Sequence, residues 1–126
     1  RMSQAFAPGH HPLGTDLRNA VLADADDVAR LLCEMGYPCE TDEAAERIDA
    51  IQANDRQALV VARRDGAVCG LIALDFMYYL PLGTITCRVT ALVVTPTAQG
   101  LGIGRALLKE AERRARAGGA ARIELT

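Results

Sequence analysis

Aromatic residues are scarce in this chain and tryptophan is absent: Phe and Tyr together make up 4% of the 126 residues. The hydrophobic core therefore has to be built from aliphatic side chains, which dominate the 50% of the chain that is apolar. A chain of this length has room for one domain with a single core. We expect one domain over residues 15–126, preceded by a flexible leader over 1–14.

Long runs of one charge are also missing. The chain has 14 basic and 16 acidic residues and a formal net charge of −2, so it lacks the basic surface that nucleic acid binding requires. Its apolar runs, including the one around 91–94, are far too short to span a bilayer, and no secretory signal is visible at the start. These absences predict a cytoplasmic protein with no nucleic acid or membrane partner.

Metal-ligand and disulfide patterns are absent as well. Four cysteines are present (Cys33, Cys39, Cys69 and Cys87), but none forms a CxxC pair or has a His at ligand spacing. Two of them lie in apolar strand segments, where thiols behave as small core residues. His10 and His11 fall in the expected leader, where a stable metal site is not expected. We therefore expect reduced thiols and no metal.

Hydrophobic periodicity predicts alternating strands and helices. Gly36 and Pro38 end the first helix, Thr41 is a candidate cap for the second, and Asp65-Gly66 is a hairpin signal. Strands are expected over 17–22, 58–63, 68–77, 84–94 and 122–126, and helices over 24–35, 42–53 and 104–117. This order indicates an α/β domain.

The segment that carries chemistry is a strand followed by a glycine-rich loop and a helix. The loop reads Gln99-Gly100-Leu101-Gly102-Ile103-Gly104, and Arg105 follows it. A helix start leaves backbone N–H groups unpaired and carries partial positive charge, and glycines let a phosphate approach those amides. The segment therefore predicts a pyrophosphate-binding loop.

Other nucleotide-binding loops fit this segment poorly. A Walker A loop needs a Lys that the loop does not contain. A dinucleotide fingerprint starting at Gly100 would need a third glycine where Arg105 stands, although Glu124 has the spacing of a ribose-binding acid. A glycine-rich connection without a ligand remains the simplest alternative.

The loop resembles the coenzyme A signature of the GNAT superfamily of N-acetyltransferases, [Gln/Arg]-x-x-Gly-x-[Gly/Ala]. The matching positions are Gln99, Gly102 and Gly104, and the order of the elements agrees from about residue 17 onward. The resemblance implies a mixed, mostly antiparallel central sheet flanked by helices. It also implies acetyl-CoA as co-substrate and direct transfer of the acetyl group to a primary amine of a small molecule or peptide. In this family the pantetheine arm lies along the preceding strand, here the backbone of Leu92, Val93 and Val94. The expected coenzyme A site therefore comprises these three residues with Gln99, Gly100, Leu101, Gly102, Ile103, Gly104 and Arg105.

The catalytic base that several family members carry is missing at the matching position. Ungapped counting places Arg88 where those members have a Glu, and Arg stays protonated. The base must then be another carboxylate, for which Asp75 in the preceding strand is the candidate, or the proton must leave through a water relay. Two-residue periodicity puts Arg88 on one strand face with Thr86 and Thr90. That stripe could bind an acceptor carboxylate or phosphate, or Arg88 could pair with an acid such as Asp75.

The acceptor side is less defined. Tyr37 and Tyr78 are candidate acceptor contacts, and nearby acids could form a negative rim that attracts a cationic amine: Glu34, Glu40, Asp42, Glu43 and Glu46. An inert acyl-CoA sensor and a non-enzymatic interaction domain are the alternative functions. The family continues through a further helix and strands after the strand at 122–126. We therefore expect either a longer protein or two chains that associate through this end.

Overall fold

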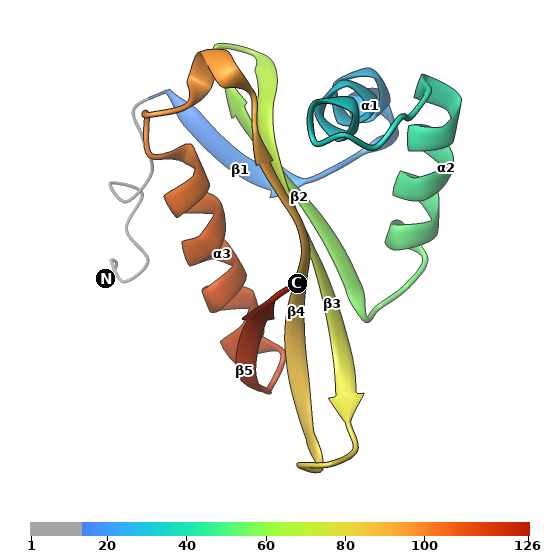
Figure 1. The fold of residues 1–126 in the computed structure, drawn as a ribbon, viewed down its shortest axis with the longest axis vertical. Coiled ribbons are helices and arrows are strands. Elements are labelled where there is room, and N and C mark those ends of the chain that lie inside the picture. Colours follow the sequence, from blue (N-terminus) through green and yellow to red (C-terminus); the bar gives the residue numbers. More distant parts are fainter. Residues whose placement is uncertain (1–13) are drawn as a thin grey trace.

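The computed structural model describes residues 14–126, so the leader expected over 1–14 lies, apart from Gly14, outside the described residues. Five strands and three α-helices follow the predicted order (Figure 1). Short 3-10 turns lie at Leu22–Asp24 and Pro96–Ala98. The elements are β1 (Thr15–Asn19), α1 (Ala25–Glu34), α2 (Thr41–Gln52), β2 (Gln57–Arg64), β3 (Ala67–Tyr79), β4 (Thr84–Val94), α3 (Ile103–Ala117) and β5 (Ala120–Leu125).

The strands form one sheet in the order β1-β2-β3-β4-β5. The first four strands are antiparallel to their neighbours and β5 is parallel to β4, which confirms the mixed, mostly antiparallel sheet. In Figure 1, α1 and α2 cover one face and α3 covers the other. The β3–β4 hairpin projects beyond the helices.

Two aliphatic clusters hold these layers together, one on each face of the sheet. On the α1–α2 side, Leu31 and Ile48 pack against Leu71. On the α3 side, Ile103 and Leu107 pack against Ile72. Each of these side chains is at most 1% exposed, and burying one contributes roughly 1.5–3 kcal/mol. The scarcity of aromatics is thus met by aliphatic packing.

The first helix begins at Asp24 as predicted, since Asp24 is the N-cap of α1, whereas the cap predicted for the second helix is wrong. Asp24 is 5% exposed and accepts hydrogen bonds from the Val21 amide at 2.8 Å and from Arg18 at 2.7 and 2.9 Å. These bonds form the 3-10 turn after β1, so the first strand ends before residue 22. Thr41 was the wrong cap: Glu40 is the N-cap of α2, and the Thr41 hydroxyl donates to Asp26 instead.

The C-terminal end of β4 is bulged and pairs with only one neighbouring strand, β3. The β3–β4 register passes from Leu74–Val89 to Ala73–Ala91, so Thr90 is an extra, bulged residue. On its other side, β4 pairs with β5 only from Ile85 to Val89. From Thr90 to Val94, that side of β4 has no strand partner among the described residues.

Because of this bulge, the predicted polar stripe of Thr86, Arg88 and Thr90 is wrong. The register places Ala91, not Thr90, on the sheet face of Arg88, because the two-residue alternation slips at the bulge. Thr86 shares the face of Arg88 but is 1% exposed, and its hydroxyl accepts a hydrogen bond from Arg122. The three side chains therefore do not form one exposed surface.

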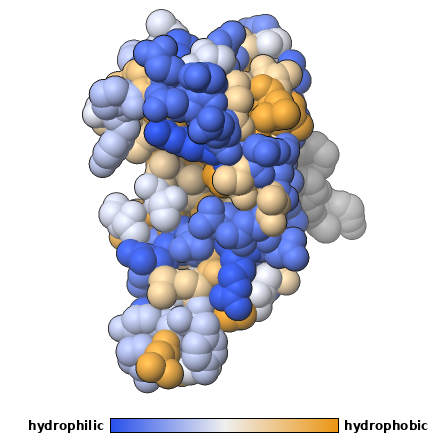
Figure 2. Space-filling model, turned by 90° about the vertical axis from the view of Figure 1, so that its right-hand side faces the viewer, coloured by the Kyte–Doolittle hydropathy of each residue, from blue (hydrophilic) through white to orange (hydrophobic). Residues whose placement is uncertain are grey.

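Polar residues cover much of the outer face of the α1–α2 layer, and at the lower end of the molecule a small hydrophobic spot lies among weakly polar residues (Figure 2). The exposed leucines of the β3–β4 turn are Leu80 and Leu82.

Candidate active site

The glycine-rich loop begins where β4 ends. Gly100 and Gly102 have φ angles of 84° and 83°, in a region that residues with a side chain adopt at a cost of roughly 1–2 kcal/mol. The side chain of Gln99 ties the loop to the end of β4, because its amide Nε2 donates a hydrogen bond to the carbonyl oxygen of Val94 at 3.1 Å. The loop thus turns sharply enough to direct the first turn of α3 toward the end of β4.

The start of α3 leaves its amide donors available. Gly102 is the N-cap, no side chain caps the first turn, and no acidic residue lies in it. By contrast, α2 has the carboxylate of Glu43 bound to the amide of its N-cap, Glu40. The amides of Ile103, Gly104 and Arg105 therefore carry the partial positive charge of the helix end without a protein counter-charge.

A cavity of about 320 Å³ lies over this helix end. A Cβ on Gly104 would meet only Val94 Cγ2, at 3.7 Å, and a Cβ on Gly100 would meet nothing within 4 Å. The space over the loop is therefore open, and its chemistry fits a pyrophosphate. The lining residues are the end of β4 and the loop: Leu92, Val93, Val94, Ala98, Gln99, Gly100, Gly102, Ile103 and Gly104.

The predicted coenzyme A residues have different parts in this cavity. The side chain of Ile103 is buried in the core, so only its backbone faces the ligand side. Leu101 is 43% exposed, and Arg105 is exposed on the first turn of α3. Neither of these two lines the cavity.

A second cavity, of about 670 Å³, adjoins the first at Leu92, which lines both. It lies beside the bulged end of β4. One wall comes from β4 and the end of β5, and the other from α1, the turn after it and α2. Its lining residues are Leu32, Met35, Tyr37, Arg47, Val89, Thr90, Ala91, Leu92, Leu125 and Thr126.

Of the predicted acceptor and catalytic residues, only Tyr37 lines this second cavity. Tyr78 lies on the projecting hairpin and is 55% exposed. None of the five carboxylates proposed as a negative rim lines the cavity. Glu34, for example, binds Arg30 and the hydroxyl of Thr95.

Arg88 on β4 and Asp75 on β3 are register partners, yet they do not form the ion pair that was the alternative to acceptor binding by Arg88. Arg88 Nε lies 3.4 Å from Oε1 of Glu124 on β5, and Asp75 accepts a weak hydrogen bond from Gln57 at 3.4 Å. The parallel strand β5 brings Glu124 to Arg88, which sequence proximity did not indicate. Glu124 also pairs with Arg122 at 3.3 Å and does not line the cavity over the glycine-rich loop, so it is not placed as a ribose-binding acid.

Sequence reasoning missed Arg47 and Thr90 as cavity residues. Arg47 lies on α2, where its exposed position was indistinguishable from that of any solvated helix residue. The sequence predicts Thr90 as a residue of a regular strand, because a run of β-branched and apolar residues gives no sign of a bulge.

The thiols are unreactive side chains of the core, with one exception. Burial raises the pKa of Cys39, Cys69 and Cys87, which keeps these thiols protonated at neutral pH. Cys33 is exposed. Within residues 14–126 no group of three or more His, Cys, Asp and Glu side chains is arranged to hold a metal ion.

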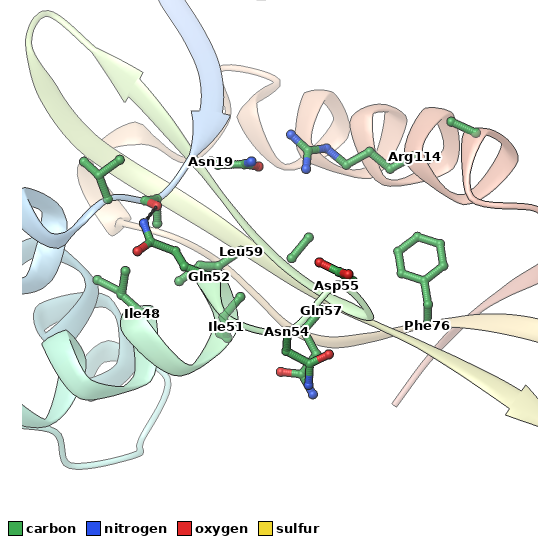
Figure 3. Close-up of a pocket in the computed structure, with 14 residues that line it drawn as sticks. Asn19, Ile48, Ile51, Gln52, Asn54, Asp55, Gln57, Leu59, Phe76 and Arg114 are labelled. Carbon is green, nitrogen blue, oxygen red and sulfur yellow. Dashed lines mark hydrogen bonds between the residues drawn. The ribbon is translucent and has the colours of Figure 1, made fainter.

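Another cavity, of about 620 Å³, lies near the start of β2 (Figure 3). Two of its polar side chains have partners: Gln52 donates to the carbonyl of Ala20 at 3.1 Å, and Arg114 donates to Glu110 at 2.8 Å. No residue of the glycine-rich loop lines it.

The sequence profile of the family described as "Acetyltransferase (GNAT) family" matches residues 25–126. The chain belongs to the GNAT family of acetyltransferases. A relative from Salmonella typhimurium, an aminoalkylphosphonate N-acetyltransferase, is 37% identical over 114 residues, which cover 88% of this chain and 73% of the relative. This GNAT protein is accordingly an acetyl-CoA-dependent N-acetyltransferase.

Solved GNAT structures show the same fold. A GNAT family acetyltransferase from Staphylococcus aureus superposes with a TM-score of 0.81 at 20% identity, covering 90% of this chain and 87% of its own. Glucosamine-6-phosphate N-acetyltransferase from Arabidopsis thaliana gives 0.79 at 14% identity, covering 89% and 81%. None of the helices within residues 14–126 has the length and apolar character needed to cross a membrane.

Proposed function

We propose that this GNAT acetyltransferase transfers the acetyl group of acetyl-CoA directly to a primary amine of a small molecule, with both substrates bound at once. The observation that carries the proposal is the junction of the two cavities at Leu92, on the side of β4 that has no strand partner. One cavity offers amides to a pyrophosphate, and the other offers a mixed polar and apolar space for the acceptor.

The backbone supplies most of the proposed coenzyme A contacts. The amides of the loop and of the first turn of α3 bind the pyrophosphate. The unpaired backbone at Leu92–Val94 pairs with the amides of the pantetheine arm like an added strand. An amide at this edge, close to the bulge at Thr90, polarises the thioester carbonyl and stabilises the oxyanion.

Proton removal from the attacking amine is assigned to water. The amine is mostly protonated at neutral pH and must lose a proton to attack. Among the described residues that line the two cavities there is no Asp or Glu, and Arg88, at the matching position, is paired with Glu124. A carboxylate at the cavities therefore has no part in the proposed step.

The Salmonella relative is named for aminoalkylphosphonates, and we propose acceptors of this size for the present chain. The cavity of about 670 Å³ beside β4 has the volume for such a molecule.

A binding variant tests the coenzyme A site. Gly104→Asp puts a carboxylate in the pyrophosphate space without backbone strain, because its Cβ meets only Val94 at 3.7 Å. Gly102→Asp would also abolish binding, but the φ of 83° adds strain. Asn54→Asp is the matched control, since it adds the same charge at the exposed turn before β2. We expect Gly104→Asp to lose acetyl-CoA binding by calorimetry while its circular dichroism is unchanged.

Turnover is measured as release of free thiol with a panel of amines. Unchanged acetyl-CoA affinity in Gly104→Asp would refute the proposed coenzyme A site. Binding without turnover for every amine would identify an inert acyl-CoA sensor instead of the proposed reaction.

A further inference from the structure

Arg47 brings an isolated positive charge to the acceptor cavity. It lies on α2, far from the glycine-rich loop, and lines the cavity of about 670 Å³ opposite the bulged end of β4. Among the described residues that line this cavity, Arg47 has the only charged side chain. An acceptor bound there would therefore meet a cation on the wall opposite the reacting strand.

No carboxylate of the described residues lies within ion-pair distance of Arg47. Glu43 stands one helical turn earlier, at the spacing of an ion pair, but its Oε1 accepts the amide hydrogen of Glu40 at 2.9 Å instead. Most other arginines in the described chain do have such a partner: Arg18, Arg30, Arg63, Arg64, Arg88, Arg113, Arg114 and Arg122.

The one hydrogen-bond partner that Arg47 has among the described residues does not neutralise its charge. Arg47 Nη1 donates to Cys39 Sγ at 3.4 Å, and a thiol is a weak acceptor. Burial raises the pKa of Cys39, so the thiol stays uncharged, and it donates its own hydrogen toward the carbonyl of Glu40 at 3.5 Å. The charge of Arg47 therefore remains available to a ligand.

The rest of the cavity favours one orientation of an acceptor. Leu32 and Met35 supply apolar walls between Arg47 and the unpaired end of β4. An amine placed at β4 for transfer would direct the other end of a short acceptor toward α2. Arg47 is exposed to solvent on its outer side, but the apolar walls on the cavity side reduce the screening between its guanidinium and an anion bound there.

We infer that Arg47 selects acceptors that carry an anionic group, a carboxylate or a phosphonate, a few atoms from the reacting amine. This inference rests on the proposed function, because it assigns the acceptor to the cavity beside β4. Arg47 is a specificity residue and takes no part in the chemical step.

The test compares acceptors of similar length that differ in charge. The anionic pair is 2-aminoethylphosphonate and β-alanine, the uncharged acceptor is propylamine, and the dicationic one is 1,3-diaminopropane. We expect the unaltered enzyme to prefer the anionic pair. Arg47→Gln should lower kcat/KM for that pair by about ten- to hundredfold, mainly through KM, and change it for propylamine by less than about twofold.

Two further variants separate charge from structure. Arg47→Lys keeps the charge but loses the planar fork, so it should recover part of the preference. Arg116→Gln removes an exposed arginine from the last turn of α3, away from both cavities, and should leave all four acceptors unchanged. Equal use of anionic and uncharged amines by the unaltered enzyme, or an equal loss for both in Arg47→Gln, would overturn the inference.

Calorimetry of 2-aminoethylphosphonate in the presence of coenzyme A distinguishes failure of the inference from failure of the proposed function. Binding that Arg47→Gln weakens, with no turnover of any amine, would uphold the inference and refute the proposed reaction. Turnover without any effect of Arg47 would do the opposite. Absence of both binding and turnover would refute both.

Discussion

Two glycines near the proposed coenzyme A site should respond in opposite ways to the same substitution. Gly70 on β3 lies opposite Val94 in the sheet register. A Cβ there would meet the carbonyl oxygen of Val93 at 3.1 Å, Leu107 Cδ1 at 3.3 Å and Ile103 Cγ2 at 3.4 Å. The two side chains are 0% and 1% exposed, so neither has free space into which to move.

Gly70→Ala should therefore destabilise the protein. Overpacking of this kind costs about 1–3 kcal/mol, while the lower entropy of the unfolded chain returns about 0.4–1 kcal/mol. The net loss is about 1–2 kcal/mol. Because the closest contact is the backbone of Val93, relief of the clash should displace the end of β4 and weaken acetyl-CoA binding as well.

Gly104→Ala should instead stabilise the protein. Its Cβ meets only Val94 Cγ2, at the ordinary contact distance of 3.7 Å, and the position is in the first turn of α3. Helix propensity and unfolded-state entropy together favour alanine by about 0.5–1 kcal/mol. The two variants thus differ in stability by about 2 kcal/mol although the chemical change is identical.

Urea unfolding of both variants measures this difference, and thermal unfolding should separate them by about 4 °C for each kcal/mol. Gly70→Ala with parental or higher stability would contradict the packing between β3 and α3. Gly104→Ala with lower stability would contradict the open space over the first turn of α3.

Three other predictions address the ion pair after β1, the bulge and the thiols. The hydrogen bond from Arg18 has the largest effect on the pKa of Asp24 and lowers it; burial opposes this effect, and the hydrogen bond from the Val21 amide adds to it. The ionised Asp24 therefore stabilises the folded protein fully above the pKa of an unfolded Asp, near 4, and this stabilisation is lost as pH falls through the folded pKa. Asp24→Asn should therefore cost about 1.5–3 kcal/mol at pH 7 in urea unfolding, and an equal cost at pH 2 would contradict this. Deletion of Thr90 should restore a regular β3–β4 register and abolish acetyl transfer in a folded protein; normal kcat/KM would show that the bulge has no catalytic part. A thiol reagent should titrate Cys33 rapidly in the native protein and the other thiols only after unfolding; rapid modification of more than one thiol would contradict their burial.

Local patterns determined much of the fold. The helix predicted over 104–117 is α3 (Ile103–Ala117), and the residues at helical spacing on its inner face are buried: Ile103, Leu107, Ala111 and Ala115. The glycine-rich loop and the helix start after it could be predicted as well, because the conformational freedom of glycine and the unpaired amides of a helix start depend on a few neighbouring residues. Element type and order follow from such short-range effects.

Only the tertiary structure decided which residues surround the bulged end of β4. Glu124 reaches Arg88 because β5 lies parallel to β4, and Thr90 is bulged because β3 and β4 pair in two registers. Arg47 lines the cavity of about 670 Å³ because α2 packs beside α1 on the same face of the sheet, next to the end of β4. These relations join residues far apart in the chain, and they depend on strand register and helix docking. A single sequence does not report either quantity, because many registers preserve the same local pattern of apolar and polar residues.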